Sequence, residues 1–307
     1  MTRLAFLGPE ATFTSQAASL AAPDADRVPL PTITEVIAAV RDGQVDIGVV
    51  PMENSIEGTV NLTLDDLAFG PVGAFIRAEI TIPIAMNLMA PPGTDLQTVT
   101  AVRSQPHALA QCRGWLAQHL PNARPQAATS TAEAAREAAG GDGSVAAIGP
   151  AVAAERFGLE ILAADIHDHD GNATRFVVLG RAMPAATGAD KTSVVVFFGE
   201  DRPGLLLRIL DEFALRGINL TKIESRPTKQ ALGEYCIFID AIGHLTQARV
   251  AEALRAVHRH AAQVRVLGSY PRSDDVADAP GAGDADADYA EATDWYGGLL
   301  ASLEGGI

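Results

Sequence analysis

Side chains that could bind an anion or donate a hydrogen bond follow or precede several short apolar runs in the first 180 residues. These side chains are Thr12, Asn54, Ser55, Ser104, Thr174 and Arg175. A guanidinium can bind a carboxylate through two parallel hydrogen bonds, and a threonine hydroxyl can donate to a departing group. The same residue types also cap helices and end strands. Their chemistry favours a small anionic substrate without proving one.

Two further motifs invite a chemical interpretation. Residues 167–170 read His-Asp-His-Asp, which looks like a metal-binding cluster. Adjacent side chains point in alternating directions, and zinc sites need three or four converging ligands, so we expect no metal here. His107 could act as an acid or base, but an exposed residue at a helix start is the commoner role.

The elements that must position these residues alternate between strand and helix over residues 1–181. The predicted strands cover residues 4–7, 46–50, 75–84, 86–90, 99–102, 145–148 and 176–179. The predicted helices cover residues 12–20, 33–40, 107–119 and 131–139. Such alternation predicts a mainly parallel sheet covered on both faces, with binding loops at the carboxyl ends of strands.

The pattern changes after a linker at residues 182–191, which is rich in Pro, Gly and small residues. Residues 192–271 predict the order βαββαβ of a ferredoxin-like domain. Its strands are expected at 192–198, 218–225, 231–241 and 263–267, and its helices at 203–215 and 246–260.

The last segment, residues 272–307, holds nine acidic residues and one Arg. This composition predicts an acidic, flexible tail, with disorder over residues 274–288. Residues 294–303 could form a short amphipathic docking helix, although a solubilising tail is the favoured interpretation.

Overall composition narrows the class of protein. The net charge of -15 argues against nucleic-acid partners, which require concentrated basic surface. Cys112 and Cys236 are too few for a disulfide scaffold or a thiolate zinc site, which fits a reducing compartment. The N-terminal apolar run is too short for a signal peptide, and no stretch approaches the length of a membrane span. We therefore expect a cytoplasmic protein without membrane partners.

Taken together, the loops resemble the prephenate dehydratase family from Arg3 to about Pro271. Asp168 and the run Thr174-Arg175-Phe176 fit the family's TRF signature, and residues 220–227 fit the ESRP signature of its ACT domain. Supporting matches are Gly8-Pro9, Thr12-Phe13, Pro51, Glu53-Asn54-Ser55, Gly58, Ala108-Leu109 and Gln111-Cys112.

The sequence departs from the family pattern at three places. Ala11 stands where the family usually has Gly. Residues 104–107 read Ser-Gln-Pro-His instead of Ser-His-Pro-Gln, so no family role for that His is carried over. Leu205 stands where the regulatory helix usually has Ala, which can reshape the effector pocket.

The resemblance implies a two-lobed catalytic domain like type II periplasmic binding proteins, residues 1–181, followed by an ACT domain. It implies conversion of prephenate to phenylpyruvate, CO2 and water in L-phenylalanine biosynthesis, with no cofactor. Thr174 would donate to the leaving hydroxyl and Arg175 would hold a carboxylate. Asn54, Ser55, Thr12 and Ser104 would add hydrogen bonds.

The resemblance also implies that L-phenylalanine binds the ACT domain and inhibits, within a homodimer or homotetramer. The effector residues carried over are Gly204, Leu205, Asn219, Glu224, Ser225, Arg226 and Pro227. Two alternatives remain open: arogenate dehydratase, and a non-catalytic amino-acid sensor. The presence of both Thr174 and Arg175 disfavours the sensor. The lack of an export signal disfavours a transport binding protein.

Overall fold

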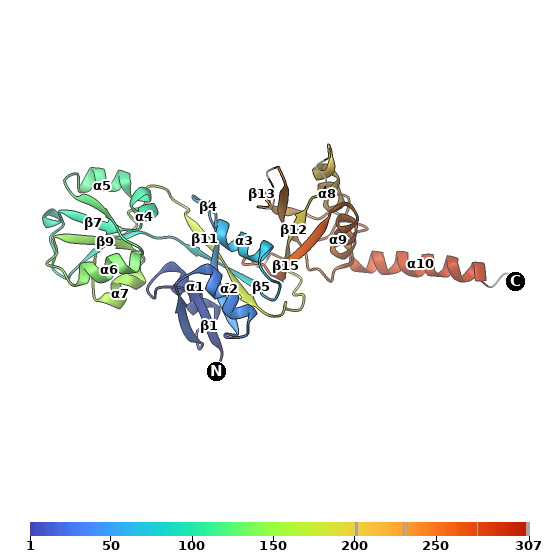
Figure 1. The fold of residues 1–307 in the computed structure, drawn as a ribbon, viewed down its shortest axis with the longest axis horizontal. Coiled ribbons are helices and arrows are strands. Elements are labelled where there is room, and N and C mark those ends of the chain that lie inside the picture. The colour runs from blue at the N-terminus through green and yellow to red at the C-terminus, as the bar shows by residue number, and fades with distance from the viewer. Residues whose placement is uncertain (200–201, 230, 232, 275, 305–307) are drawn as a thin grey trace. The chain divides into compact units, whose positions relative to one another are not determined.

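The computed structural model describes residues 1–307 except 200–201, 230, 232, 275 and 305–307 (Figure 1). By its internal contacts the chain forms two compact units. The N-terminal unit comprises Met1–Ala74 and Ile80–Arg181, and the C-terminal unit comprises Phe75–Glu79 and Ala182–Ile307. The predicted domain boundaries differ from this division because five residues of one strand pack with the C-terminal unit.

The first sheet of the N-terminal unit has a parallel core closed by an antiparallel strand. The strand order is β11-β3-β1-β2, and the short β4 forms a hairpin with β3. These strands are β1 (Arg3–Leu7), β2 (Asp26–Leu30), β3 (Ile47–Asn54), β4 (Gly58–Thr59) and β11 (Ala173–Gly180). The accompanying helices are α1 (Phe13–Ala21), α2 (Ile33–Arg41) and α3 (Asn61–Phe69).

A β-bulge interrupts the pairing of β11 with β3. Phe176 lies opposite Pro51, but Arg175 lies opposite Glu53, so Met52 is the extra residue on β3. An extra residue shifts the register by one position and turns all following side chains to new partners. As a result Thr174 lies opposite Asn54.

The second sheet of this unit has the order β10-β6-β9-β7-β8. Its strands are β6 (Asn87–Ala90), β7 (Ala101–Ser104), β8 (Arg124–Ala127), β9 (Val145–Gly149) and β10 (Glu160–Ala163). The helical segments are the 3-10 turn η1 (Leu96–Thr98), α4 (Pro106–Gln111), α5 (Arg113–His119), α6 (Thr131–Ala139) and α7 (Ala151–Phe157). Buried Leu88, Val102 and Ile148 form part of its core.

The C-terminal unit is an antiparallel sheet in the order β13-β14-β12-β15, packed with two helices. Its elements are β12 (Asp190–Phe197), α8 (Leu205–Ala214), β13 (Leu220–Pro227), β14 (Tyr235–Ile242), α9 (Ala248–His260) and β15 (Gln263–Pro271). This is the predicted βαββαβ order. The predicted strand over 231–241 starts later, and its residue 232 lies outside the described residues.

The strand β5 (Phe75–Pro83) contributes its first residues to the C-terminal unit, where Ile76 pairs with Gly268 of β15. Glu79 of this segment forms a buried ion pair with Lys191 of β12, with side-chain exposures of 2% and 10%. Both Glu79 oxygens lie within 3.1 Å of Lys191 Nζ. The Ser273 N–H donates to Glu79 Oε1 at 3.1 Å, so the buried carboxylate is held from two sides.

Several predicted elements need correction. Both sheets of the N-terminal unit are mixed rather than mainly parallel, because β11, β6 and β10 pair antiparallel. The helix predicted over residues 107–119 is divided at Cys112 into α4 and α5. Strands β2, β8 and β10, and helices α3 and α7, are absent from the prediction.

The acidic tail contains an anchored segment and a long helix. Asp278 pairs with the buried Arg249 side chain, and its N–H donates to Gly188 O at 3.0 Å. Helix α10 (Asp286–Glu304) contains the helix predicted at residues 294–303 and exposes Trp295. The flexibility of the tail stays a prediction. Among the described residues, no helix combines the length and apolar character needed to cross a bilayer.

We predict that Lys191→Met lowers the free energy of unfolding by about 3 kcal/mol, because it leaves the Glu79 charge buried without its partner. Urea unfolding followed by circular dichroism measures the effect. Arg259→Met, at an exposed position of α9, is the control and should change stability by less than about 0.5 kcal/mol. Equal stability of the two variants would show that the buried pair contributes nothing.

Candidate functional site

Thr174 is held by an amide on the neighbouring strand. Asn54 Nδ2 donates to Thr174 Oγ1 at 2.9 Å, and Thr174 is 9% exposed. Asn54 Oδ1 accepts the main-chain N–H groups of Ile56 and Glu57, each at 2.9 Å. Because main-chain N–H groups can only donate, they fix which end of the Asn54 amide faces Thr174. Thr174 Oγ1 is therefore a hydrogen-bond acceptor in this contact.

Asn172 and Gln111 extend the hydrogen bonds of Asn54 in the direction away from Thr174. Asn54 Nδ2 also donates to Asn172 Oδ1 at 2.8 Å, and it makes a longer 3.3 Å contact with Ala173 O. Asn172 Nδ2 donates to Gln111 Oε1 at 3.0 Å. Asn172 is 4% exposed, so its amide has little access to water. These contacts join the end of β3, the start of β11 and helix α4.

Ser55 is engaged with the main chain beside β11. Its N–H donates to Ala173 O at 2.9 Å, and its Oγ accepts the Ala173 N–H at 3.0 Å. The Ser55 hydroxyl also lies 3.3 Å from Gly171 O, to which it donates. Ser55 thus fixes the chain that leads into Thr174.

Arg175 lies next to a carboxylate. Arg175 Nε is 3.7 Å from Glu53 Oε2, and the Arg175 side chain is 13% exposed. A guanidinium can bind a carboxylate through two parallel hydrogen bonds. Arg175, Thr174, Asn54 and Ser55 thus lie together at one end of the β3–β11 pair.

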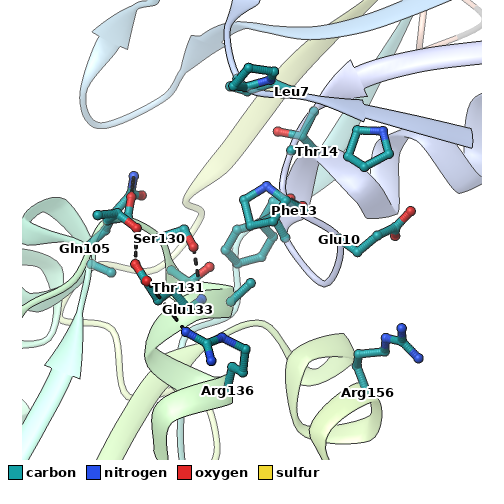
Figure 2. Close-up of a pocket in the computed structure, with 18 of the residues that line it drawn as sticks. Leu7, Glu10, Phe13, Thr14, Gln105, Ser130, Thr131, Glu133, Arg136 and Arg156 are labelled. Carbon is teal, nitrogen blue, oxygen red and sulfur yellow. Dashed lines mark hydrogen bonds and ion pairs between the residues drawn. The ribbon is translucent and has the colours of Figure 1, made fainter.

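A cavity of about 940 Å³ lies between α1 and α6 in the N-terminal unit (Figure 2). Thr12 and Ser130, which cap the N-termini of α1 and α6, both line it. Figure 2 shows Thr14 and Phe13 of α1 facing Ser130 and Thr131 of α6. Helix N-termini carry partial positive charge, which favours an anion. His107 and Gln111 also line the cavity, so the contacts beginning at Thr174 reach its wall.

Two predicted site residues have their hydroxyls engaged within the protein. Thr12 Oγ1 accepts the Ser15 N–H at 3.2 Å and donates to Pro9 O at 3.0 Å. Ser104 is fully buried, and its Oγ donates to Ile148 O at 2.7 Å. Thr12 lines the cavity, whereas Ser104 lies behind it in the second sheet. The structure brings Ser104 to neither the cavity nor Thr174.

Three residues that contact the site are not among the predicted site residues: Asn172, Gln111 and Glu57. Gln111 Nε2 donates to Glu57 Oε1 at 3.0 Å, and His107 Nδ1 lies 3.3 Å from Glu57 Oε2. A helix turn separates His107 from Gln111, which places both on one face of α4. That spacing is the signal by which the sequence could have linked them.

Asp168, one residue of the His-Asp-His-Asp stretch, caps a helix. Its carboxylate accepts the main-chain N–H groups of Gly114 at 2.8 Å and Trp115 at 3.0 Å, at the start of α5. This contact accounts for the new helix start after Cys112. Burial, reinforced by the Asp168 charge, raises the pKa of the Cys112 thiol to about 12. Within the described ranges, no three His, Cys, Asp or Glu side chains are placed to hold a metal ion.

The predicted effector residues lie at the start of α8, directly before β13 and at the end of β13 in the C-terminal unit. Gly204 precedes α8 with φ +83°, a conformation that favours glycine. Asn219 accepts the Ile242 N–H at 2.9 Å through its main-chain oxygen. Residues 224–227 were expected in a loop but form the end of β13, where Glu224 pairs with Lys222 at 3.0 Å and Arg226 at 3.5 Å.

Comparison with known proteins identifies relatives over nearly the whole chain. The prephenate dehydratase family model matches residues 4–184, and the ACT domain model matches residues 193–259. A Mycobacterium tuberculosis protein named prephenate dehydratase is 45% identical, covering 98% of this chain and 95% of its own. The crystal structure of Arthrobacter aurescens prephenate dehydratase in complex with L-Phe is 44% identical, with a TM-score of 0.89, and covers 97% of this chain and 99% of its own.

A third relative is more distant. The Staphylococcus aureus prephenate dehydratase structure is 31% identical, with a TM-score of 0.76, covering 88% of this chain and all of its own. Agreement with these proteins confirms the family resemblance and the α/β fold with an ACT domain.

We predict that Asp168→Ala lowers the free energy of unfolding by about 1–2 kcal/mol, because it removes the capping group from two N–H groups of α5. Thermal or urea unfolding measures the loss. Asp170→Ala, an exposed carboxylate two residues away, is the matched control and should be nearly neutral. A metal-ligand role for this stretch would instead make the parent protein lose stability on addition of a chelator, and both variants would lack that response.

Proposed function

The chain belongs to the prephenate dehydratase family, and from that premise we propose that Thr174 donates a hydrogen bond to the departing hydroxyl of prephenate and that L-phenylalanine slows this reaction from the ACT domain. The reaction itself is the one after which the relatives are named. The observation that carries the assignment of Thr174 is its contact with Asn54, which leaves the hydroxyl proton available.

Prephenate carries two carboxylates and a ring hydroxyl. In the reaction the bond to the ring carboxylate breaks, its electron pair enters the ring, and the hydroxyl leaves with the electron pair of its own bond. The leaving hydroxide takes a proton from solvent, so the products are CO2, water and phenylpyruvate with its aromatic ring. Because aromatisation supplies the driving force, the protein must mainly orient the dianion and stabilise the leaving hydroxyl.

Thr174 is suited to the leaving hydroxyl. Its Oγ1 accepts from Asn54 Nδ2, and no acceptor for its own proton occurs within the described part of the chain. An alcohol is a weak acid, so Thr174 supplies a positioned hydrogen bond rather than full proton transfer. Asn54 holds Thr174, and Ser55 holds the chain before it.

The two carboxylates call for separate binding groups. Arg175 is the group for one of them, because it follows Thr174 directly in β11 and a guanidinium can bind a carboxylate through two parallel hydrogen bonds. The helix starts at Thr12 and Ser130, which open on the cavity, suit the other. Ser104 supports the second sheet through Ile148 and contributes to binding only indirectly.

Regulation by L-phenylalanine is supported by the ACT domain and by the Arthrobacter structure that contains L-Phe. The proposed contacts are the Gly204–Leu205 turn, Asn219 and residues 224–227. Inhibition requires that L-phenylalanine bind a less active state more tightly. We place this site at an interface between two copies of the chain, which makes a homodimer or homotetramer part of the proposal.

We predict that Thr174→Val lowers kcat at least about 100-fold with little change in KM, because the lost hydroxyl acts in the transition state. Phenylpyruvate formation from prephenate, read by its absorbance in alkali, measures the rate. Thr174→Ser keeps the hydroxyl and should retain most of the activity. An unchanged kcat in the Val variant removes Thr174 from the mechanism. Arogenate keeps its amino group and would yield L-phenylalanine, so turnover of this alternative substrate is followed by L-phenylalanine formation.

We predict that turnover falls sigmoidally with added L-phenylalanine and that Asn219→Ala raises the half-inhibiting concentration at least about tenfold. Basal turnover should stay within about twofold of the parent, because Asn219 lies in the ACT domain. Gln263→Ala removes another amide from the same unit and serves as control. Parallel loss of inhibition in both variants would argue against a specific contact at Asn219.

A further inference from the structure

Four residues beside Thr174 close a ring of hydrogen bonds. Asn54 Nδ2 donates to Asn172 Oδ1 at 2.8 Å, and Asn172 Nδ2 donates to Gln111 Oε1 at 3.0 Å. Gln111 Nε2 donates to Glu57 Oε1 at 3.0 Å, and the Glu57 N–H returns to Asn54 Oδ1 at 2.9 Å. Every bond therefore donates in the same sense around the ring.

Glu57 determines that sense because it enters the ring twice. Its carboxylate can only accept and its main-chain N–H can only donate. Between these two fixed groups, each of the three amides has one orientation that satisfies both neighbours. His107 Nδ1, 3.3 Å from the other Glu57 oxygen, holds the carboxylate in place. Bonds that run in one sense also strengthen one another.

Thr174 lies outside this ring and is hydrogen-bonded to it through Asn54. The Asn54 amide donates both to Asn172 Oδ1 within the ring and to Thr174 Oγ1 outside it. Reversal of the Asn54 amide would present Oδ1 to Thr174 and draw the threonine proton away from the substrate. The main-chain N–H groups of Ile56 and Glu57 exclude this reversal. The rest of the ring fixes the position from which Asn54 Nδ2 reaches Thr174 Oγ1, so that Thr174 keeps its own proton for another acceptor.

We propose that Glu57 and Asn172 are positioning residues that act on Thr174 by holding the Asn54 amide in place through this ring. The inference rests on the proposed role of Thr174. The inference also assigns a role to His107. His107 and Gln111, one turn apart on α4, each contact one of the two carboxylate oxygens of Glu57. The ring ties α4, beside the second sheet, to the β3–β11 end of the first sheet.

The test replaces a hydrogen-bond donor of the ring by an acceptor at one residue, and then replaces an acceptor by a donor at another. In Asn172→Asp the new carboxylate demands a donor from Gln111, which then turns its oxygen toward the Glu57 carboxylate. We expect kcat to fall at least about 30-fold with KM changed less than about threefold. In the double variant Asn172→Asp with Glu57→Gln, the new amide donates to the reversed Gln111, and kcat should recover at least about tenfold relative to Asn172→Asp.

Asn87 supplies the matched control. It is likewise a buried asparagine of the N-terminal unit, 4% exposed, but among the described residues its amide contacts only main-chain groups, including Gly149 O at 3.3 Å. Glu57→Gln should give no recovery in an Asn87→Asp background. A double variant that is as slow as Asn172→Asp, or equal recovery in the Asn87 background, overturns the proposal.

A second cycle covers the case in which Asn172→Asp does not fold. Asn172→Ala and Glu57→Ala each open the ring, so the second substitution should add little to the kcat loss caused by the first. If the kcat loss of the double variant equals the product of the two single losses, the proposal is overturned. The parent and Thr174→Val are measured alongside. An inactive parent, or a fully active Thr174→Val variant, refutes the proposed function. The proposal about the ring is refuted instead if the effects of the Asn172 and Glu57 substitutions on kcat and on the free energy of unfolding are independent of each other.

Discussion

The antiparallel pairing of β11 with β3 is the constraint on which the site depends. It joins residues about 120 positions apart in the sequence and places Thr174 opposite Asn54. The register is set by the bulge at Met52, without which Thr174 would face Glu53. Since a shift of one residue reverses the side chain's face, the bulge decides which group holds the threonine. The contact between Thr174 and Asn54 thus follows from a backbone irregularity in the pairing of β11 with β3.

Polar groups here specify geometry more than they stabilise the fold. Asn172 and Asn54 have hydrogen-bond partners that are already fixed by main-chain groups or by a carboxylate. The free energy lost when a buried amide faces a wrong partner exceeds the free energy gained from a correct hydrogen bond. Each satisfied hydrogen bond therefore excludes the alternative orientations. The same logic holds for Glu79 and Lys191 in the C-terminal unit, where one buried charge requires the other.

Local signals predict much of the fold. Helix α6 matches its predicted range because Ser130 caps one end and Gly140 follows the other. The edge strand β8 is exposed at every residue and carries no apolar alternation, so its sequence contains no strand signal. The site is predictable in its residue types but not in its partners. Ser104 follows an apolar run as a binding residue would, yet only the tertiary fold shows that its hydroxyl turns inward to Ile148.

The strand β5 links the two units in a way that bears on how such chains evolve. Its first five residues are built into the C-terminal unit, although they lie more than a hundred residues before the rest of it. The ACT domain therefore does not consist of one continuous segment that recombination at the linker could exchange. A chain cut there would lose the strand segment that carries Glu79, together with the counter-charge of Lys191. Inheritance of the regulatory domain is in this respect tied to inheritance of the catalytic one.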